Sequence, residues 1–557
     1  MGDLVISLRR RRARRVVRAV STREAYLSAR VLNALLREDY GGLAARVTRD
    51  KAGVALTLAS GRRVRLTSGG FAGLFQDFVV APAEELGLDE VLETLADVAE
   101  AADAAGVTAF AEECRETLLA LDLYDRQRER TRKNPRRGQI RNDRDKQTLP
   151  GPENPQIRID RTTIGYEALA ACIDHPIYPT ARCRSGLSSA ELLAYAPEFS
   201  PAFELRWAAV PQESVVSRGS GGFWPGFAQV GLPELDGHVL FPVHPLSVGS
   251  LPEVIVGAVP YLRVRPTLSM RTVEVDPRTH LKLPLATSTL GARNRRSIRP
   301  GTLRDGAEAE RLLRGVLDRE PGLRVSLADE QTYAHAGQEY LAWMIRRLPD
   351  GEIVSVAALA APGVLPDLAD RYYRGDVEAL LRDYLTVLFT WNTTLFVRYG
   401  IALEAHQQNL ALVFGDGPMR LLVKDNDGLL AAPDRLAASG LDVPVFGDQR
   451  MFTDDPHALA DVFITITLHL AAAAITVGAL GEADLVRATL ADALDAFGDD
   501  PTARLLRART LDAARLVGKS MVTAGTLVDK RRTGARDINK FYGTSGPNYL
   551  VITQRSI

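Results

Sequence analysis

Cysteine is scarce in this chain of 557 residues, which contains only Cys114, Cys172 and Cys183. None of the three forms a CxxC pair, and such an odd, sparse set argues against a disulfide framework and against a structural zinc site. A chain of this kind is typical of a reducing compartment. We therefore expect a cytoplasmic protein.

A net charge is also lacking, because 69 Lys and Arg balance 69 Asp and Glu. Without a basic excess the chain is not predicted to bind nucleic acid, and without an acidic excess it is not a disordered acidic tail. Lysine itself is rare, with eight residues against 61 arginines, so a lysine inside a motif is informative. Hydrophobic residues at 46% and charged residues at 25% indicate a folded globular protein.

The sequence offers little that resembles a membrane segment. The uncharged stretch 462–481 contains Thr465, Thr467, His469 and Thr476, which is typical of a buried core helix. The arginine cluster at 9–15 is not followed by the apolar segment of an export signal. We interpret residues 1–20 as a disordered basic extension and expect no membrane partner.

The hydrophobic periodicity predicts an α+β fold. Ser21 and Glu24 match a capping box before a helix that ends near Arg37, and alternating residues at 54–58 and 64–66 predict a hairpin. Two helices are expected near 83–104 and 108–123, a mainly antiparallel β region over 162–349 and a mainly helical region after 354. These patterns give domains at 21–124, 156–350 and 351–557, with a polar linker or mobile lid at 125–155.

One polar segment lies on each side of a predicted hairpin in the helical region. Glu404, His406, Gln408 and Asn409 precede the strand 410–414, and Asp425 follows the strand 421–423. The hairpin brings both clusters to the same end, where carboxylate and amide oxygens suit Mg²⁺ and a nucleotide. The structural alternative is a polar hairpin on the surface of a helical domain.

Two further segments are rich in anion-binding side chains. The first contains Ser269, Arg271 and Thr272, followed by the rare Lys282 and by Arg293. These hydroxyl, guanidinium and ammonium groups are suited to phosphate. The second is the proline-rich stretch 174–186, which carries His175, Tyr178, Arg182 and Arg184, and its His-Pro pair recurs at 244–245. Each proline turn by itself is more often structural, with the histidine capping backbone groups.

In this order the segments resemble the IucA/IucC family of siderophore synthetases that act independently of nonribosomal peptide synthetases. The family's landmarks are a His-Pro-x-His-Pro-x-x-Lys-x-Arg-x-Gly segment, a Ser-x-Arg-Thr strand, and a Glu-Ala-His-x-Gln-Asn segment with a downstream Arg-Asp. The resemblance runs from about Ser21 to the region of Asn548. It implies a cupped hand in which 21–124 is the thumb, 156–350 the ATP-binding fingers and 351–557 the palm.

The resemblance also implies an activity. Such enzymes use ATP and Mg²⁺ to convert a carboxylic acid, often citrate or a related polycarboxylate, to an acyl-adenylate with release of pyrophosphate. They then condense it with an amine, hydroxylamine or alcohol, so the expected partners are small molecules, with a homodimer by family analogy. Adenylation provides the leaving group that a free carboxylate lacks, and fixed cations stabilise the charge that develops on phosphate.

Residue by residue, the resemblance implies three groups of contacts. ATP would be bound by His175, Arg184, Ser269, Arg271, Thr272, Lys282, Gln408 and Asn409. The metal would be bound by Asp425, Asn409 and Glu404. The substrate carboxylate would be bound by Arg293, His406, Tyr178 and Arg182, with Arg293 and His406 as the catalytic residues and His406 also active in proton transfer during condensation.

The sequence departs from the family pattern at four places. Tyr178 stands where the family has its second His, Arg182 where it has Lys, Lys424 where it has Arg, and Leu246-Ser247 where it often has Trp-Gln. Replacing an imidazole by a phenol removes a titratable group, so the acid or the nucleophile can differ from the common citrate chemistry. Two other functions remain open: a small-molecule kinase that uses the same Mg-ATP cleft, and a non-catalytic polycarboxylate- or siderophore-binding protein.

Overall fold

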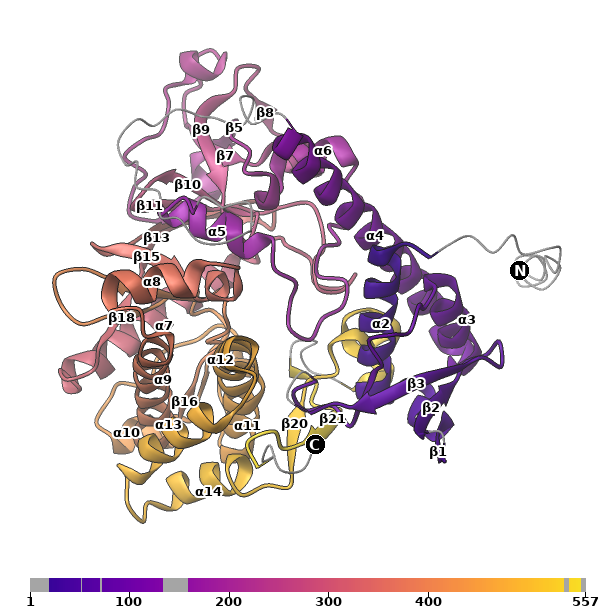
Figure 1. Ribbon diagram of the computed structural model, residues 1–557. Coiled ribbons are helices and arrows are strands. Elements are labelled where there is room, and N and C mark those ends of the chain that lie inside the picture. The colour runs from indigo at the N-terminus through magenta and orange to yellow at the C-terminus, as the bar shows by residue number, and fades with distance from the viewer. Residues whose placement is uncertain (1–19, 52, 71–72, 134–158, 535–539, 552–557) are drawn as a thin grey trace, which may run out of the picture.

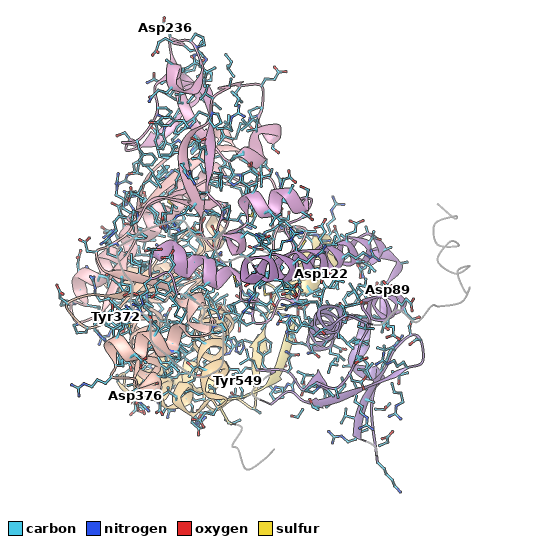
Figure 2. All side chains as sticks on the ribbon, turned by 45° about the horizontal axis from the view of Figure 1, so that its top comes forward. Asp89, Asp122, Asp236, Tyr372, Asp376 and Tyr549 are labelled. Carbon is cyan, nitrogen blue, oxygen red and sulfur yellow. The ribbon has the colours of Figure 1, made fainter. Side chains whose placement is uncertain are left out.

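The computed structural model describes residues 20–51, 53–70, 73–133, 159–534 and 540–551. Figure 1 shows three bodies: an N-terminal body in indigo, a β-rich body at the top and a mainly helical body in orange and yellow. In Figure 2 the labelled side chains mark them, with Asp89 and Asp122 in the first, Asp236 at the far end of the second, and Tyr372, Asp376 and Tyr549 in the third. The predicted basic extension at 1–20 lies, except for its last residue, outside the described residues.

The N-terminal body packs helices against a four-stranded antiparallel sheet in the order β1-β2-β3-β4. Its elements are α2 (Thr22–Arg37), β1 (Val47–Asp50), β2 (Gly53–Thr57), β3 (Arg63–Ser68), β4 (Phe78–Val80), α3 (Leu88–Val98) and α4 (Ala104–Lys133). Helix α2 begins where predicted, because the Ser21 hydroxyl accepts the N–H of Glu24 at 3.1 Å. The Glu24 carboxylate accepts the N–H of Leu88 at 3.1 Å and so links the first turns of α2 and α3.

Helix α4 corrects the predicted start of the linker. The helix continues to Lys133, so the first nine residues of the stretch 125–155 are helical. Polarity alone does not end a helix, and the chain between 107 and 133 contains neither glycine nor proline. Asp125 also accepts a bidentate ion pair from Arg23 on α2 at 2.5 Å. The rest of the predicted linker or lid, from residue 134, lies outside the described residues.

The β-rich body is built on a nine-stranded sheet in which all the neighbouring strands are antiparallel, as the sequence predicted. Its order is β6 (Val216–Arg218), β13 (Asp329–Gln338), β14 (Leu341–Arg347), β11 (Thr279–Lys282), β10 (Thr272–Asp276), β9 (Tyr261–Pro266), β5 (Phe203–Pro211) and β7 (His238–Val243), with β8 (Ile255–Val256) also paired to β5. The helices of this region are α5 (Thr163–Ala171), α6 (Ser189–Tyr195) and α7 (Pro300–Arg319).

The register of this sheet places two cationic side chains on one face. His280 lies opposite Arg346, and Lys282 lies opposite Met344. Residues two apart on a strand point to the same side, so Lys282 and Arg346 share a face of the sheet.

A smaller four-stranded sheet joins the β-rich body to the helical body. Its order is β12 (Val325–Leu327), β18 (Arg420–Val423), β17 (Leu410–Phe414) and β15 (Glu352–Ser355), with β12 parallel to β18. Strands β17 and β18 form the predicted hairpin, in which Leu410 pairs with Val423. Because β12 is followed after one residue by β13, the run 325–338 contributes a strand to each sheet.

The helical body carries most of the remaining core. It contains α8 (Val364–Tyr372), α9 (Val377–Thr394), β16 (Ile401–Ala402), β19 (Leu430–Ala431), α10 (Pro433–Ala438), α11 (Pro456–Val462), α12 (Ala474–Leu480), α13 (Asp484–Asp495) and α14 (Pro501–Thr510). In the described part of the chain, one helix, Pro456–Leu480, is long and apolar enough to span a membrane, but 83% of its apolar window is buried inside the protein. It is therefore the buried core helix that the sequence predicted.

The C-terminal segment returns to the N-terminal body. Strands β20 (Arg515–Gly518) and β21 (Thr544–Pro547) pair beside α2, and a short π-helical turn, Thr523–Leu527, lies against α4 ahead of α15 (Lys530–Thr533) (Figure 1). The buried Glu38 carboxylate accepts the N–H groups of Val522 and Thr523 at 3.0 and 2.8 Å. This contact holds the segment that follows Lys519 against α2.

Candidate active site

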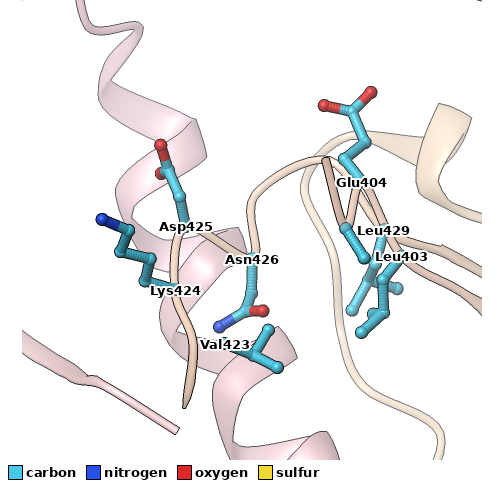
Figure 3. Close-up of a pocket in the computed structure, with 8 residues that line it drawn as sticks. Leu403, Glu404, Val423, Lys424, Asp425, Asn426 and Leu429 are labelled. Carbon is cyan, nitrogen blue, oxygen red and sulfur yellow. The ribbon is translucent and has the colours of Figure 1, made fainter. Parts of the chain in front are cut away.

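The β17–β18 hairpin brings the two predicted polar clusters together. The N–H of Lys424 donates to the carbonyl of Asn409 at 3.0 Å, which extends the strand pairing past Val423. The segment 404–409 and the segment 424–428 therefore lie side by side at one end of the small sheet. Figure 3 shows the carboxylates of Glu404 and Asp425 pointing to the same side of a small pocket that these segments line.

Asp425 is the centre of an ionic cluster. Its carboxylate accepts the Lys282 ammonium and lies 3.7 Å from Nη2 of Arg346, while Lys282 also lies 3.5 Å from Asp427. Burial raises the pKa of Asp425, but Lys282, Arg346 and Arg271 outweigh it, so the pKa is well below its usual range. Asp425 is thus ionised and surrounded by cations.

Lys424 points away from this cluster into the protein. Its ammonium pairs with the Glu167 carboxylate of α5 at 2.8 Å, and both side chains are less than one-tenth exposed. The other oxygen of Glu167 accepts the N–H of Leu268 at 3.0 Å. Glu167 therefore joins the hairpin to the turn that precedes β10.

That turn presents the predicted Ser-x-Arg-Thr residues. The Ser269 hydroxyl accepts the N–H of Thr272 at 3.1 Å, and Met270 adopts a left-handed φ of 63°. The Arg271 guanidinium donates to the carbonyl of Ser297 at 3.0 Å, and its charge acts on both Asp425 and Arg296. The structure thus brings Arg271 and Lys282 to the Asp425 cluster from the β-rich body, while Ser269 forms its hydrogen bonds within its own turn.

Arg296, rather than Arg293, faces this cluster. Burial lowers the pKa of Arg296 to about 9, with Arg271 and Arg184 lowering it further and Asp425 and Asp427 opposing them. Its Nε atom is buried without a hydrogen-bond partner. A buried guanidinium in such surroundings is complementary to an anion.

Arg293 contacts the C-terminal turn instead. Its backbone N–H donates to the carbonyl of Gly525 at 3.1 Å, and its guanidinium donates to the carbonyl of Ala524 at 3.3 Å. The predicted contact of Arg293 with the substrate carboxylate stays a prediction. Among the neighbouring arginines at 293, 295 and 296, Arg296 is the one that interacts electrostatically with Asp425 and Asp427.

The imidazoles of His175 and His406 and the ammonium of Lys519 form a second group. Burial lowers the pKa of His406 to about 4, with the Lys519 ammonium as the next cause, and burial lowers the pKa of His175 to about 3, with His406 and Lys519 contributing. Both histidines are therefore neutral at pH 7. Lys519 itself is 6% exposed.

Both imidazoles use Nδ1 as an acceptor. His406 Nδ1 accepts the N–H of Gln408 at 3.3 Å, and His175 Nδ1 accepts the N–H of Tyr178 at 3.0 Å. His244 makes the same contact with Leu246 at 3.2 Å. For His175 and His244 these bonds are the structural capping role that was expected of a histidine in a proline turn. They also assign the proton of each neutral ring to Nε2.

Tyr178 lies in the core of the N-terminal body, which corrects its predicted contact with substrate. Its side chain is fully buried, and its hydroxyl donates to Glu113 of α4 at 2.8 Å. Glu113 also accepts the hydroxyls of Thr180 and Thr526 at 2.6 and 3.0 Å. Tyr178 therefore helps to join three segments of the chain.

Arg182 is also directed away from the cluster. It pairs with Asp174 at 2.8 Å, and its guanidinium lies over the Tyr124 ring at 5.4 Å from the centroid. These partners satisfy the guanidinium inside the segment 172–182, so its predicted role in carboxylate binding is not supported by the geometry. Arg184, in contrast, is near enough to Arg296 to lower its pKa.

Two family models match the chain in succession. The model described as the IucA / IucC family matches residues 162–361, and the model described as ferric iron reductase FhuF-like transporter matches residues 378–531. Over residues 162–361 the chain is therefore similar to the IucA/IucC family. The region matched by the second model contains none of the three cysteines.

Two of the curated relatives of this chain are named for siderophore biosynthesis. It is 28% identical over 335 residues to staphyloferrin B synthase of Staphylococcus aureus, covering 50% of this chain and 56% of that protein. It is 27% identical over 383 residues to the rhizobactin siderophore biosynthesis protein RhbC of Rhizobium meliloti, covering 57% and 62%. The chain thus spans about half the length of the curated relatives it matches.

Solved structures support the fold over nearly the whole chain. The petrobactin biosynthesis protein AsbB of Bacillus anthracis aligns with a TM-score of 0.73 at 14% identity, covering 95% of this chain and 96% of that one. The aerobactin synthetase IucC of Klebsiella pneumoniae aligns with a TM-score of 0.60 at 19% identity, covering 87% and 94%. At these identities the likeness shows only the fold of this chain.

Lys519 and Arg296 are the site residues that sequence reasoning missed. The rarity of lysine was a usable signal, because four of the eight lysines, Lys282, Lys424, Lys519 and Lys540, lie at the cluster or on its border. Arg296 had no such signal, because arginine is abundant in the chain. The other predicted residues, Gln408, Asn409 and Glu404, lie together on the segment before β17.

Proposed function

We propose that this protein is an ATP-dependent synthetase that adenylates a carboxylic acid and condenses it with an amine, hydroxylamine or alcohol in siderophore-type biosynthesis. The observation that carries the proposal is the meeting of Lys282 with Asp425 and Asp427 beside Arg271 and Arg296. One wall of this cluster is cationic and the other is carboxylate. Such a site suits a metal–triphosphate and a carboxylic acid at the same time.

In the first step a carboxylate oxygen of the acid attacks the α-phosphorus of ATP, a new P–O bond forms, and pyrophosphate leaves. Lys282, Arg271, Ser269 and Thr272 are assigned to the phosphates, with His175, Arg184, Gln408 and Asn409 around the nucleotide. Fixed cations stabilise the charge that develops on the phosphate oxygens. In the second step the nucleophile attacks the acyl carbon, loses its proton, and AMP leaves.

The donor set fits magnesium held jointly with phosphate. Asp425 and Glu404 are the carboxylates that would hold the ion, with the Asn409 amide beside them. Among the described residues, no group of three or more His, Cys, Asp or Glu side chains is arranged to hold a metal by itself. Mg²⁺ in nucleotide sites needs only one or two carboxylates, since phosphate and water provide the remaining ligands. The bound ion would neutralise triphosphate charge.

The acid is assigned to the second group together with Arg296, whose charge also acts on His406. His406, which is neutral and carries its proton on Nε2, is a hydrogen-bond donor to a carboxylate in this state, and Lys519 and Arg296 supply positive charge. Proton transfer at condensation would require His406 to use the other tautomer. Two cationic residues beside a neutral donor favour an acid with more than one carboxylate, such as a citrate-like polycarboxylate. The names thumb, fingers and palm then apply to 21–124, 156–350 and 351–557.

Product analysis with purified protein tests this proposal. Mg²⁺-ATP is supplied with a panel of polycarboxylic acids and of amines, hydroxylamines and alcohols. Pyrophosphate, AMP and an amide or ester support the synthetase. ADP and a phosphorylated acceptor would establish the kinase instead, and tight binding of an acid without nucleotide turnover would establish a binding protein.

A further inference from the structure

Asp425 has a backbone conformation that its side chain does not favour. Its φ of 65° lies in the left-handed region, which costs free energy for a residue with a Cβ unless the surroundings hold it. The N–H of Asp425 donates to the Glu330 carboxylate at 3.0 Å. A side chain from the nine-stranded sheet therefore holds the backbone of the residue that is assigned to magnesium.

Glu330 is held in turn by a buried guanidinium. Arg346 Nε donates to the same Oε1 atom of Glu330 at 2.5 Å, and the two side chains are 5% and 3% exposed. Arg346 Nη2 lies 3.7 Å from the Asp425 carboxylate and is buried without a hydrogen-bond partner. Glu330 and Arg346 thus contact Asp425 at its backbone and at its side chain.

The fold places both residues at the junction of the two sheets. Glu330 lies in the second position of β13, directly after the strand β12 that pairs with β18, and Arg346 lies near the end of β14. The N–H of Glu330 donates to the fully buried Glu310 of α7 at 2.7 Å, which holds its backbone. The position of the pair is therefore set by regular elements and not by a loop.

We propose that Glu330 and Arg346 form a positioning pair that holds Asp425 in its left-handed conformation and orients its carboxylate. The pair does not touch nucleotide or acid; it acts through Asp425. Arg346 remains a fixed cationic neighbour of Asp425 when Lys282 engages phosphate. This inference rests on the proposed function, because it gives the pair a role at the metal–nucleotide site.

The test is the affinity for Mn²⁺, which is measured by electron paramagnetic resonance on the full chain in the presence of a non-hydrolysable ATP analogue. Residues that orient a metal ligand without touching the metal typically contribute about 10- to 100-fold to metal affinity. We expect Glu330→Gln and Arg346→Lys to weaken Mn²⁺ binding by this factor. The double change Glu330→Gln with Arg346→Met removes both charges of the buried pair, so neither is left without its partner. It therefore provides a second variant with the same expected loss.

Glu352→Gln is the matched control. Glu352 also forms a two-pronged pair, with Arg371 at 2.6 and 2.8 Å, but this pair lies outside the cluster around Asp425. Its Mn²⁺ affinity should equal that of the wild type, whatever the loss of thermal stability. If all the Glu330 and Arg346 variants bind Mn²⁺ with wild-type affinity, the positioning role is wrong and the proposed function still stands. If the wild-type protein binds no metal–nucleotide complex, both the positioning role and the proposed function are wrong.

Discussion

The Lys282 ammonium on strand β11 donates to the Asp425 carboxylate that follows strand β18, and so joins the β-rich body to the hairpin of the helical body. The side chain of Lys282 is 4% exposed and that of Asp425 is 23% exposed. The pair is thus shielded from solvent on the lysine side and accessible on the carboxylate side. An anionic ligand that reaches Lys282 must compete with Asp425 or coordinate a cation with it.

The first prediction concerns this pair. Lys282→Ala and Asp425→Ala should each lower kcat by about 100- to 1000-fold, because each removes a preorganised charge at the reacting phosphate. Both variants should stay folded, since Asp425 keeps Arg346 as a neighbour and Lys282 keeps Asp427. Pyrophosphate release and thermal unfolding measure the two effects. Near wild-type turnover in both variants would place the active site elsewhere.

The second prediction separates the three neighbouring arginines. Arg296→Ala should raise KM for the acid by at least about tenfold, because losing a hydrogen bond to a charged group costs roughly 1.5 kcal/mol or more. Arg295→Ala is the matched control, because Arg295 is exposed and pairs with Glu339 at 3.1 Å. Arg293→Ala should leave KM unchanged as well. A larger effect of Arg293→Ala than of Arg296→Ala on KM would support Arg293, the residue predicted from the sequence, as the carboxylate ligand.

The sequence predicted those parts of the site that depend on local order. A hairpin between 410 and 423 necessarily returns residue 424 beside residue 409, so the meeting of the two polar clusters follows from strand periodicity and a turn. The antiparallel sheet likewise follows from the alternation of apolar and polar residues. The buried helix around His469 follows from the polar residues within an apolar run. The start of α2 is encoded by Ser21 alone.

The parts that failed depend on side-chain direction across long separations. Tyr178 occupies a motif position, but it is directed to Glu113, 65 residues earlier, by the packing of α4. Nothing near residue 178 in the sequence indicates that partner. Glu330 and Arg346 were missed for the same reason, because they meet Asp425 only through the junction of two sheets. The predicted end of α4 is wrong because a polar composition also suits an exposed helix.

The third prediction tests the corrected position of Tyr178. Tyr178→Phe removes one buried hydrogen bond to Glu113 and should lower the free energy of unfolding by about 1 kcal/mol. Because the side chain lies in the N-terminal body, kcat and KM should remain those of the wild type. Urea denaturation and steady-state kinetics measure these effects. A fall in kcat at unchanged stability would return Tyr178 to the active site.

The fourth prediction concerns the buried pair of Lys424 with Glu167. Glu167→Gln leaves the Lys424 ammonium buried without its counter-charge, so the free energy of unfolding should fall by about 3 kcal/mol. The glutamine still offers an oxygen to the N–H of Leu268, so the loss reports the charge. Adding Lys424→Met should recover most of the loss in urea denaturation. No recovery in the double variant would mean that the ionic pair is not the cause.

The last prediction is a pH dependence of stability that arises from His469. Its ring stacks on Phe75 with centroids 4.2 Å apart, and its nitrogens contact the Tyr549 hydroxyl and the Val517 carbonyl at 2.9 Å each. A carbonyl only accepts, so Nε2 carries the proton and Nδ1 accepts from Tyr549. Burial lowers the pKa of His469 to about 4 in the folded protein.

Since the folded pKa lies below the unfolded value of about 6.5, the unfolded state binds the proton more tightly. The contribution of His469 to stability is therefore complete above pH 6.5 and is lost as the pH falls toward 4, by roughly 3 kcal/mol for a shift of this size. His469→Gln can keep both hydrogen bonds but cannot titrate. The free energy of unfolding of this variant, measured in urea, should fall less steeply between pH 7 and pH 5 than that of the wild type. If the two proteins lose stability in parallel over this range, His469 is not the group that titrates.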